Sequence, residues 1–335
     1  MLAWVETCNS VFFLVLVARE APGNVTTMES ATSLMVGLEE LETVSKGATC
    51  NVKLYRRKGE SKVYAVKVID MKRASTDGNM ARQVQREKLA LEAVSAGSEY
   101  IVDFFGACKD SLNLYFLLEY VDGGDLYKHI QAGPGRRLPK KHAQVYGLQI
   151  SKAICYLHEN NWVYRDLKAN NIAISSTGNC KLFDFGTAKQ LPDLPFRTKT
   201  QLGVGHHYAP EVVCGEEHGL PADWWSFGVL IVEMLTGEPP FPYLLKNGEK
   251  ETLKSLICTG LDYEELKKNP FVRGEALELV EKLTRQNPSE RIEASDVLEQ
   301  GWFSNDANLE STHVTALIQN KTETTGLKND PFADW

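Results

Sequence analysis

The sequence predicts an α+β fold with two lobes, a small β-rich lobe followed by a larger helical lobe. Between about Leu38 and Val68, short runs of Val, Leu and Tyr are broken by Gly, Thr and Lys, which indicates strands joined by turns. After the pair Gly123 and Gly124, the apolar residues recur mostly at helical spacing. Strands first and helices second favour segregated layers, so we expect the lobes to join near residues 119–124. A cleft between two lobes is a common place for a ligand.

Periodicity and β-branched content predict the elements between these landmarks. In chain order we expect a helix over residues 79–94, strands over 101–105 and 114–120, and short β-like segments over 172–174 and 180–183. These elements belong to one domain, 37–303, with the small lobe over 37–119 and the large lobe over 124–303. Residues 1–36 form an N-terminal extension, and the polar residues 304–335 indicate an extended C-terminal tail.

The composition is that of a soluble globular protein. Of the 335 residues, 43% are hydrophobic and 24% are charged, a balance that supports a core without disulfides or metals. The net charge of -7 argues against nucleic acid or an anionic membrane as the main partner. The seven cysteines are scattered and include no CxxC pair, which indicates reduced thiols in a cytoplasmic compartment.

An apolar run over residues 11–18 leaves two interpretations open. It resembles the core of a signal peptide, but no basic residue precedes it, and Glu6 stands in that flank. The run is far too short to cross a bilayer. We therefore expect no transmembrane segment, and we favour a packing segment or a poorly ordered terminus over a signal or anchor.

Strict alternation over residues 63–69 places Lys67 on the same strand face as Ala65 and Ile69. A lysine among apolar residues needs an anionic partner, unless it lies on an edge strand and extends to water. The helix that follows offers such a partner, because Glu87 lies within an apolar stripe at helical spacing. We expect Lys67 and Glu87 to pair, which would orient the lysine toward phosphate oxygens.

A second group of polar residues lies in the middle of the chain. Asp166, Lys168 and Asn171 are close enough in sequence to converge on one point of a loop. There a carboxylate can accept a hydroxyl proton, a cation can stabilise a moving phosphoryl group, and an amide oxygen can bind Mg²⁺. Asp184 ends an apolar strand just before a glycine turn and offers a second hard oxygen ligand. A turn rich in Asn and Asp, without catalytic meaning, is the alternative.

Together these segments resemble the signature motifs of protein kinases: a strand lysine, a helix glutamate, a catalytic loop and an Asp-Phe-Gly turn, in the expected order. The likeness runs from about Leu38 to Phe303. The segment Ala209-Pro-Glu211 resembles the end of a kinase activation loop, and Arg291 is placed to pair with Glu211. The resemblance implies the bilobal protein-kinase fold, with an ATP cleft between the lobes.

Three features narrow the resemblance to the AGC group. Tyr164 replaces the usual histidine of the catalytic loop, Asp223 is followed by two tryptophans, and residues 286–291 have the sequence QNPSER. These features resemble cGMP-dependent protein kinases, with cAMP-dependent kinases next. The polar tail, which ends in PFADW, is loosely similar to the C-terminal extension of these kinases.

The resemblance implies ATP and Mg²⁺ as cofactors and assigns residues to them. Asp166 and Lys168 would be catalytic, and Asn171 and Asp184 would bind the metal. Adenine would lie between the sheet and the large lobe, and the hinge backbone would meet its edge. The residues implied in ATP binding are Ser45, Gly47, Val52, Ala65, Lys67, Glu87, Leu118, Glu119, Val121 and Asp125.

The loop that should cover the nucleotide departs from the family pattern. In place of GxGxxGxV the sequence has SKGATCNV over residues 45–52, so only Gly47 and Val52 match. Glycines in such loops let backbone N–H groups approach phosphates, and Cys50 instead brings a side chain to the turn. We therefore expect weaker ATP binding than is usual for the family. Cys50 is either an exposed, oxidisable thiol or, as we favour, an inert one.

The substrate side departs from the pattern as well. Val204 stands where the resembled kinases carry a threonine that hydrogen-bonds the catalytic aspartate, so one positioning contact is lost. Asp125 and Glu233 match acidic positions that receive substrate arginines. Asn170 and His206 occupy two other such positions and carry no negative charge at neutral pH. We expect a blunted preference for basic substrates.

Thr200 stands before Glu211 at the spacing of an activation-loop phosphosite in the resembled family. Arg165 and Lys189 would receive the phosphate through charge-assisted hydrogen bonds. This interpretation implies an upstream activating kinase as a partner. The alternative is that Thr200 is one of several loop threonines, with Thr198 beside it.

The predicted function is that of a serine/threonine protein kinase, which transfers the γ-phosphoryl group of ATP to hydroxyls of protein substrates. A catalytically silent kinase fold that binds nucleotide or partner proteins is the alternative, supported by the altered loop and by Val204. Retention of all the charged catalytic residues argues against it. A small-molecule kinase of similar fold is disfavoured by Lys168 and by the long segment that ends at Glu211, which suits a polypeptide.

Overall fold

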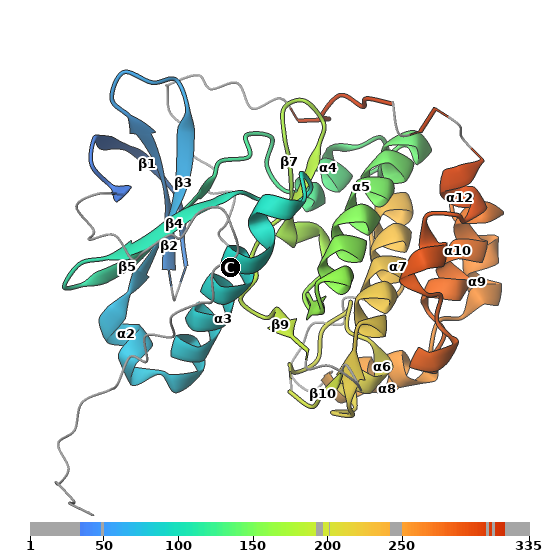
Figure 1. Cartoon of the computed structure of the whole chain (residues 1–335). Coiled ribbons are helices and arrows are strands. Elements are labelled where there is room, and N and C mark those ends of the chain that lie inside the picture. Colours follow the sequence, from blue (N-terminus) through green and yellow to red (C-terminus); the bar gives the residue numbers. More distant parts are fainter. Residues whose placement is uncertain are drawn as a thin grey trace, which may run out of the picture.

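A sheet lobe and a helical lobe stand side by side, on the left and right of Figure 1, as the predicted α+β fold requires. The structure is a computed structural model, and it describes residues 34–47, 50–191, 197–200, 202–241, 250–305, 308–309 and 312–318. The apolar run 11–18 and the end of the polar tail lie outside these residues. Within them, no helix is both long and apolar enough to cross a bilayer.

The small lobe is a five-stranded antiparallel sheet with strand order β1-β2-β3-β5-β4. Its strands are β1 (Leu38–Lys46), β2 (Cys50–Arg57), β3 (Val63–Asp70), β4 (Phe104–Lys109) and β5 (Asn113–Glu119). Between β3 and β4 lie the short helix α2 (Met71–Thr76), which the sequence did not predict, the long helix α3 (Gly78–Val94) and the turn η1 (Ser95–Gly97).

Helix α3 lies on the side of the sheet that faces the large lobe (Figure 1). It begins after Asp77, whose carboxylate accepts hydrogen bonds from the N–H groups of Asn79 and Met80. Its apolar stripe is buried as expected, and Glu87 is buried within it. The helix therefore carries one carboxylate into the space between the lobes.

One predicted strand starts later than expected. The strand expected over residues 101–105 begins at Phe104 instead. Ile101 is fully buried and forms an isolated parallel bridge with Leu182 of the large lobe, and the N–H of Val102 donates to the Leu182 carbonyl at 3.0 Å. The β-branched run is thus divided, because its first residues connect the two lobes before the chain enters the sheet.

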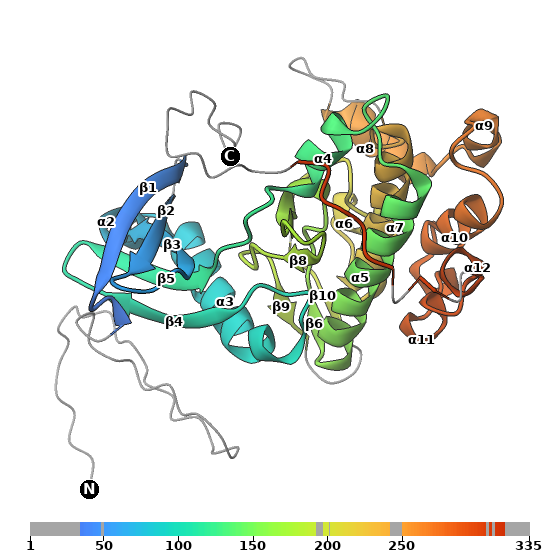
Figure 2. The same ribbon diagram turned by 90° about the horizontal axis from the view of Figure 1, so that it is seen from above.

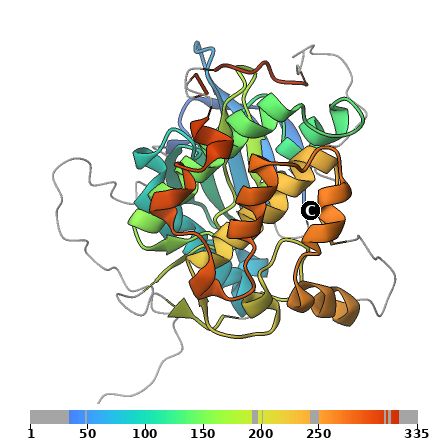
Figure 3. The ribbon, with the colours of Figure 1, turned by 90° about the vertical axis from the view of Figure 1, so that its right-hand side faces the viewer.

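The large lobe is built around two long helices, α5 (Lys140–Glu159) and α7 (Pro221–Thr236), as Figure 3 shows from its outer side. Nearly every residue of α7 is buried, which fits its almost uninterrupted apolar sequence. The other helices are α4 (Leu126–Ala132), α6 (Pro210–Val213), α8 (Lys250–Thr259), α9 (Tyr263–Lys268), α10 (Glu275–Leu283), α11 (Ala294–Val297) and α12 (Gly301–Ser304).

Short strand pairs and turns shape the side of the large lobe that faces the sheet. The predicted β-like segments are confirmed as β7 (Ile172–Ile174) and β8 (Cys180–Leu182), which pair with each other. The remaining short elements are β6 (Trp162–Val163) paired with β9 (Lys189–Gln190), β10 (Arg197–Thr198) paired with β11 (His218–Gly219), and the turns η2 (Ala169–Asn171) and η3 (Pro288–Glu290).

The described part of the C-terminal tail packs on the large lobe. Val314 and Ala316 are buried, and His142 of α5 forms a 3.2 Å hydrogen bond with the Thr315 carbonyl. Gly178, in the turn between β7 and β8, touches the Val314 backbone so closely that a Cβ there would clash. This red segment runs past α5 toward α4 in Figure 2. The polar tail is therefore anchored by its few apolar residues.

Candidate active site

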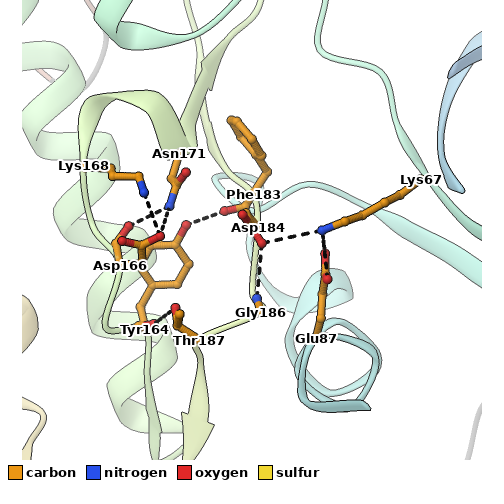
Figure 4. A network of polar contacts seen from close by, with 10 residues as sticks. All are labelled: Lys67, Glu87, Tyr164, Asp166, Lys168, Asn171, Phe183, Asp184, Gly186 and Thr187. Carbon is orange, nitrogen blue, oxygen red and sulfur yellow. Dashed lines mark hydrogen bonds and ion pairs between the residues drawn. The ribbon is translucent and has the colours of Figure 1, made fainter. Parts of the chain in front are cut away.

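Lys67 of β3 and Glu87 of α3 form a close ion pair. The Lys67 Nζ atom lies 2.7 and 2.9 Å from the two carboxylate oxygens of Glu87 and 3.7 Å from Oδ1 of Asp184 in the large lobe. Figure 4 shows the lysine reaching from the sheet to both carboxylates. Burial disfavours the ammonium, but the two carboxylates outweigh burial and raise the pKa of Lys67 above its ordinary value. The lysine therefore stays a cation that bridges the lobes.

The sheet register gathers the side chains expected around adenine. Val52 of β2 pairs with Lys67 of β3, and Ala65 of β3 pairs with Leu118 of β5. All three apolar side chains are half-buried, so they form part of the sheet face beside the lysine. Leu118 also packs against the main core.

Asp166, Lys168 and Asn171 converge in the loop between β6 and β7. Lys168 donates to Oδ2 of Asp166 at 3.0 Å, and Asn171 Nδ2 donates to the same oxygen at 2.7 Å. Asn171 Nδ2 also donates to the Asp166 backbone carbonyl at 2.9 Å. Figure 4 shows this cluster facing the pair formed by Lys67 and Asp184. The loop thus places a cation and an amide at hydrogen-bonding distance from one carboxylate.

Burial sets the chemistry of Asp166. Its side chain is only 15% exposed, and burial raises its pKa above the ordinary value, although Lys168 and the bond from Asn171 act in the opposite direction. A carboxylate whose pKa is raised is a stronger base when it is ionised. Asp166 is therefore suited to accept a proton from a hydroxyl group placed beside it.

The oxygen atoms of Asn171 and Asp184 fit a magnesium ion. Asn171 is almost fully buried, and its Oδ1 atom has no hydrogen-bond partner among the described residues. An unsatisfied buried acceptor is costly and calls for a ligand. The Asp184 carboxylate adds a second hard oxygen. The described residues contain no cluster of three His, Cys, Asp or Glu suited to a metal, so phosphate oxygens or water would have to complete the coordination, as is usual for Mg²⁺.

The backbone around the site is held in sparsely populated conformations. Arg165 has φ 70° and Asp184 has φ 56°, values that non-glycine residues rarely adopt. Fully buried Asp223 of α7 accepts the N–H groups of Tyr164 and Arg165, each at 2.8 Å. The hydroxyl of Tyr164 donates to the carbonyl of Phe183. These bonds hold the loop that contains Arg165 against the Asp-Phe-Gly turn. They therefore maintain the strained backbone at Arg165 and Asp184, which orients the neighbouring side chains.

The nucleotide loop turns tightly at Gly47. The N–H of Gly47 donates to the Cys50 carbonyl at 2.9 Å, and a Cβ on Gly47 would lie 3.0 Å from that oxygen. A side chain at position 47 would therefore crowd the Cys50 backbone, which favours the glycine that is retained there. Ser45 is buried and pairs with Val52 across the hairpin, whereas the residues 48–49 at the tip lie outside the described residues.

The hinge is tied to both lobes. The Glu119 N–H donates to the Asp103 carbonyl at 2.9 Å, and Lys181 of β8 lies 2.7 Å from the Glu119 carboxylate. Val121 follows as a half-buried residue of the connection. Asp125 is buried, caps α4 through the Lys128 N–H at 2.8 Å and pairs with the Lys128 ammonium at 3.4 Å. The contact with ATP that the resemblance implies for Asp125 would have to compete with these bonds.

A basic cluster surrounds Thr200. Lys189 Nζ lies 2.6 Å from the hydroxyl of Thr198 and 3.4 Å from that of Thr200. Burial and the neighbouring cations Arg165 and Arg86 lower the pKa of Lys189, and burial and Arg86 lower the pKa of Arg165 to about 10. The Arg165 Nη1 atom is buried without a partner among the described residues. The sequence did not single out Arg86, because no local pattern relates α3 to the activation segment.

Two further contacts organise the segment after Thr200. Arg291 forms a two-pronged ion pair with Glu211, at 2.6 and 2.7 Å, and both side chains are buried. Glu233 of α7 is also buried and hydrogen-bonds to His207 at 2.8 Å. The role of His207 could not be read from the sequence, since it depends on a contact between the activation segment and α7. Val204 packs on the apolar cluster beneath this segment.

Residues 38–303 match the family described as "protein kinase domain", and this range includes all of these site residues. The chain belongs to the protein kinase family. This kinase domain is 32% identical over 260 residues to protein kinase C zeta type of Oryctolagus cuniculus and 34% identical over 239 residues to atypical protein kinase C of Drosophila melanogaster. It is 32% identical over 269 residues to cAMP-dependent protein kinase type 3 of Saccharomyces cerevisiae.

These three matches cover 77%, 70% and 79% of the chain, but 43%, 38% and 64% of the relatives. The chain thus spans less than half the length of the protein kinase C relatives and slightly less than two thirds of the cAMP-dependent one. The relatives are AGC-group kinases, the group that the motifs predict. The finer likeness to cGMP-dependent kinases stays a prediction.

Proposed function

We propose that this protein is an active serine/threonine protein kinase that uses ATP and Mg²⁺. The observation that carries the proposal is the cluster in which Lys168 and Asn171 both bind one oxygen of Asp166, while Lys67 of the small lobe reaches Asp184 of the large lobe. Each of these groups has a use in phosphoryl transfer, which relies on positioning and charge stabilisation. Similarity to serine/threonine kinases supports the same conclusion.

In the proposed reaction, the substrate hydroxyl oxygen attacks the γ-phosphorus of ATP. A new P–O bond forms, the bond from the γ-phosphorus to the bridging oxygen breaks, and ADP leaves with the electron pair. Asp166 orients the hydroxyl and accepts its proton. Lys168 stabilises the charge on the phosphoryl group in transit, and Lys67, braced by Glu87, holds the α and β phosphates.

Magnesium, held by Asn171 and Asp184, would neutralise phosphate charge when it is bound. Gly47 and the backbone near it would contact the phosphates, with Ser45 supporting the turn. Val52, Ala65 and Leu118 would line the adenine site, and the hinge backbone from Glu119 to Val121 would meet the adenine edge. Asp125 is the proposed ribose contact that requires a rearrangement, because Lys128 and the α4 N-terminus already use its carboxylate.

The proposed substrates are proteins with only a weak preference for arginine before the acceptor. Glu233 is 1% exposed and is engaged by His207, so it offers little charge to an incoming arginine. Burial lowers the pKa of His206, so this imidazole is neutral at pH 7. A positional peptide scan is expected to show weak selection for arginine upstream of the acceptor, and strong selection at two positions would contradict this.

Thr200 is the proposed activation-loop phosphosite. Burial and neighbouring cations lower the pKa values of Arg165 and Lys189, and a phosphate bound between them would favour their charged forms. Arg165 and Lys189 would receive the phosphate, and Arg86 joins them. An upstream activating kinase is thus a proposed partner, and a cytoplasmic location is proposed for the protein.

A nucleotide-binding scaffold is the second candidate. Two observations favour it: the nucleotide loop carries Cys50 in place of a glycine, and Val204 cannot donate a hydrogen bond to Asp166. Neither removes a charged group of the site. We therefore place the scaffold second to the active kinase.

The deciding experiment compares the purified chain with its Asp166→Asn variant, in ATP and Mg²⁺, on a mixed library of Ser and Thr peptides. We expect phosphate incorporation by the wild type and a loss of about 100-fold or more in the variant. Wild-type protein that binds nucleotide but gives no more product than the variant would favour the scaffold.

A further inference from the structure

Two thiols meet outside the active site, where the end of the activation segment packs against α8. Cys214 follows α6 as its C-terminal cap, and Cys258 lies in the last turn of α8. Their sulfur atoms are 2.7 Å apart. A disulfide bond measures about 2.0 Å, so a sub-ångström approach would allow the bond to form. We propose that Cys214 and Cys258 form a reversible disulfide when the protein meets hydrogen peroxide.

The two helices are placed to keep the thiols together. Figure 1 shows α6 and α8 side by side at the base of the large lobe, and they contact each other directly. An apolar cluster that includes Val213, Trp225 and Ile257 fills the space between them, and Cys258 packs against it. The Gln286 side chain also donates to the Cys258 carbonyl at 2.8 Å. The pair therefore does not depend on a mobile side chain finding a partner.

The surroundings assign different roles to the two sulfurs. Cys214 is exposed to solvent, whereas Cys258 is half-buried. Burial and the adjacent Cys214 sulfur raise the pKa of Cys258 above its ordinary value, against the opposing charge of Lys254. Cys214 is therefore the thiol that peroxide reaches first, and Cys258 is the thiol that resolves the oxidised sulfur.

The reaction balances with one peroxide molecule. The Cys214 thiolate attacks a peroxide oxygen, an S–O bond forms, the O–O bond breaks, and the leaving hydroxide takes up a proton to become water. The Cys258 sulfur then attacks the Cys214 sulfur, so an S–S bond forms and the S–O bond breaks. The second water leaves with the Cys258 proton. The two thiols together lose two electrons to the peroxide, and thiol reductants reverse the step.

The bond would attach the activation segment to α8 at a second point. Glu211 already holds the segment through its buried pair with Arg291, and the disulfide would add a covalent tie at Cys214. We expect slower amide hydrogen exchange in α6 and α8 of the oxidised protein, because both helix ends become linked. The site is independent of the proposed kinase activity, since its chemistry needs neither ATP nor substrate.

The test treats the reduced full chain with increasing hydrogen peroxide and maps its peptides without reduction. We expect a loss of two hydrogen atoms in the intact mass, a linked peptide that contains Cys214 and Cys258, and its disappearance in dithiothreitol. The thermal midpoint should rise by several degrees in the oxidised form, because the bond closes a long loop.

Matched variants separate this pair from general oxidation. Cys258→Ser should leave Cys214 as a sulfenic acid that dimedone captures, whereas Cys155→Ser, in α5, should retain the Cys214–Cys258 link. The proposal is overturned if both thiols remain open to alkylation at peroxide concentrations that fully oxidise free cysteine added to the same solution. It is also overturned if Cys214 links only to a second chain.

Discussion

Asp166 is a carboxylate whose chemistry depends on its immediate neighbours. Burial raises its pKa, while the Lys168 ammonium at 3.0 Å and the Asn171 amide at 2.7 Å act against that rise. The carboxylate must be ionised to accept a proton, so activity is expected above its pKa and is lost as the pH falls through it. Removing Lys168 takes away an opposing influence, so the pKa should rise further.

Lys168→Met is therefore expected to move the acid limb of the kcat/KM profile to higher pH and to lower kcat about 100-fold. The measurement is a pH–rate profile on a fixed peptide. Lys268→Met, on exposed α9, is the control and should leave the limb in place. An acid limb that does not move in Lys168→Met would show that Asp166 is not the group that titrates.

Helix α3 links two parts of the molecule, because two neighbouring residues of the helix face different sites. Glu87 lies between the lobes and pairs with Lys67 at 2.7 Å, while Arg86 lies near the cations Arg165 and Lys189. A phosphate on Thr200 would thus contact the same helix that orients the lysine. This arrangement would couple the activation segment to the nucleotide site through one rigid element.

We expect phosphorylation of Thr200 to raise the free energy of unfolding less in Arg86→Gln than in the wild type, by about 1–2 kcal/mol, because one charge-assisted contact is missing. Urea denaturation of wild type and Arg86→Gln, each in the phosphorylated and the phosphatase-treated form, gives the four free energies of unfolding that are needed. Arg82→Gln, on an exposed turn of α3, is the control. Equal gains in wild type and Arg86→Gln would remove Arg86 from the phosphate site.

The buried ion pair between Glu211 and Arg291 holds the end of the activation segment against the large lobe. Arg291→Met leaves a buried carboxylate without its partner, and we expect a loss of about 3–5 kcal/mol in the free energy of unfolding. Chemical denaturation measures this, with the exposed Arg285→Met as control. The double variant Glu211→Gln with Arg291→Met should recover part of the loss, and no recovery would mean that the pair itself is not the cause.

At the scale of the whole molecule, polar contacts between described residues join the two lobes. Lys67 lies 3.7 Å from Asp184, and Lys181 lies 2.7 Å from Glu119. The backbone bridge between Ile101 and Leu182 adds a further connection. A ligand that binds Lys67 and Asp184 together would therefore stabilise both lobes at once.

ATP with Mg²⁺, at about 100 times its Kd, should stabilise the protein by about 2.7 kcal/mol, a rise of about 5 °C in Tm. Differential scanning fluorimetry with ATP alone and with ATP and Mg²⁺ separates the metal-dependent part. Asp184→Asn should lose that part, and Asp110→Asn, in an exposed turn of the small lobe, should keep it. A metal-dependent rise that survives in Asp184→Asn would move the metal site elsewhere.

Local sequence patterns determined most of the fold and the chemical inventory. Alternation around Lys67, the stripe that contains Glu87, the close spacing of the polar residues after Asp166 and the apolar strand before Asp184 depend on residues close in the chain, so periodicity and spacing could predict them. The bounds of β7 followed for the same reason. The strand start at Phe104 did not, because Ile101 is drawn into a contact with Leu182, a residue far along the chain.

The tertiary structure alone decided the contacts between distant segments. Arg86 joins Thr200's basic cluster, His207 engages Glu233, and Cys214 meets Cys258 only after the helices pack. No local periodicity encodes these distances, because they depend on how α3, α6, α7 and α8 are placed around a shared core. The sequence by itself therefore determined which groups carry the proposed chemistry. Packing decided which distant residues approach these groups, because the partners come from elements that are far apart in the chain.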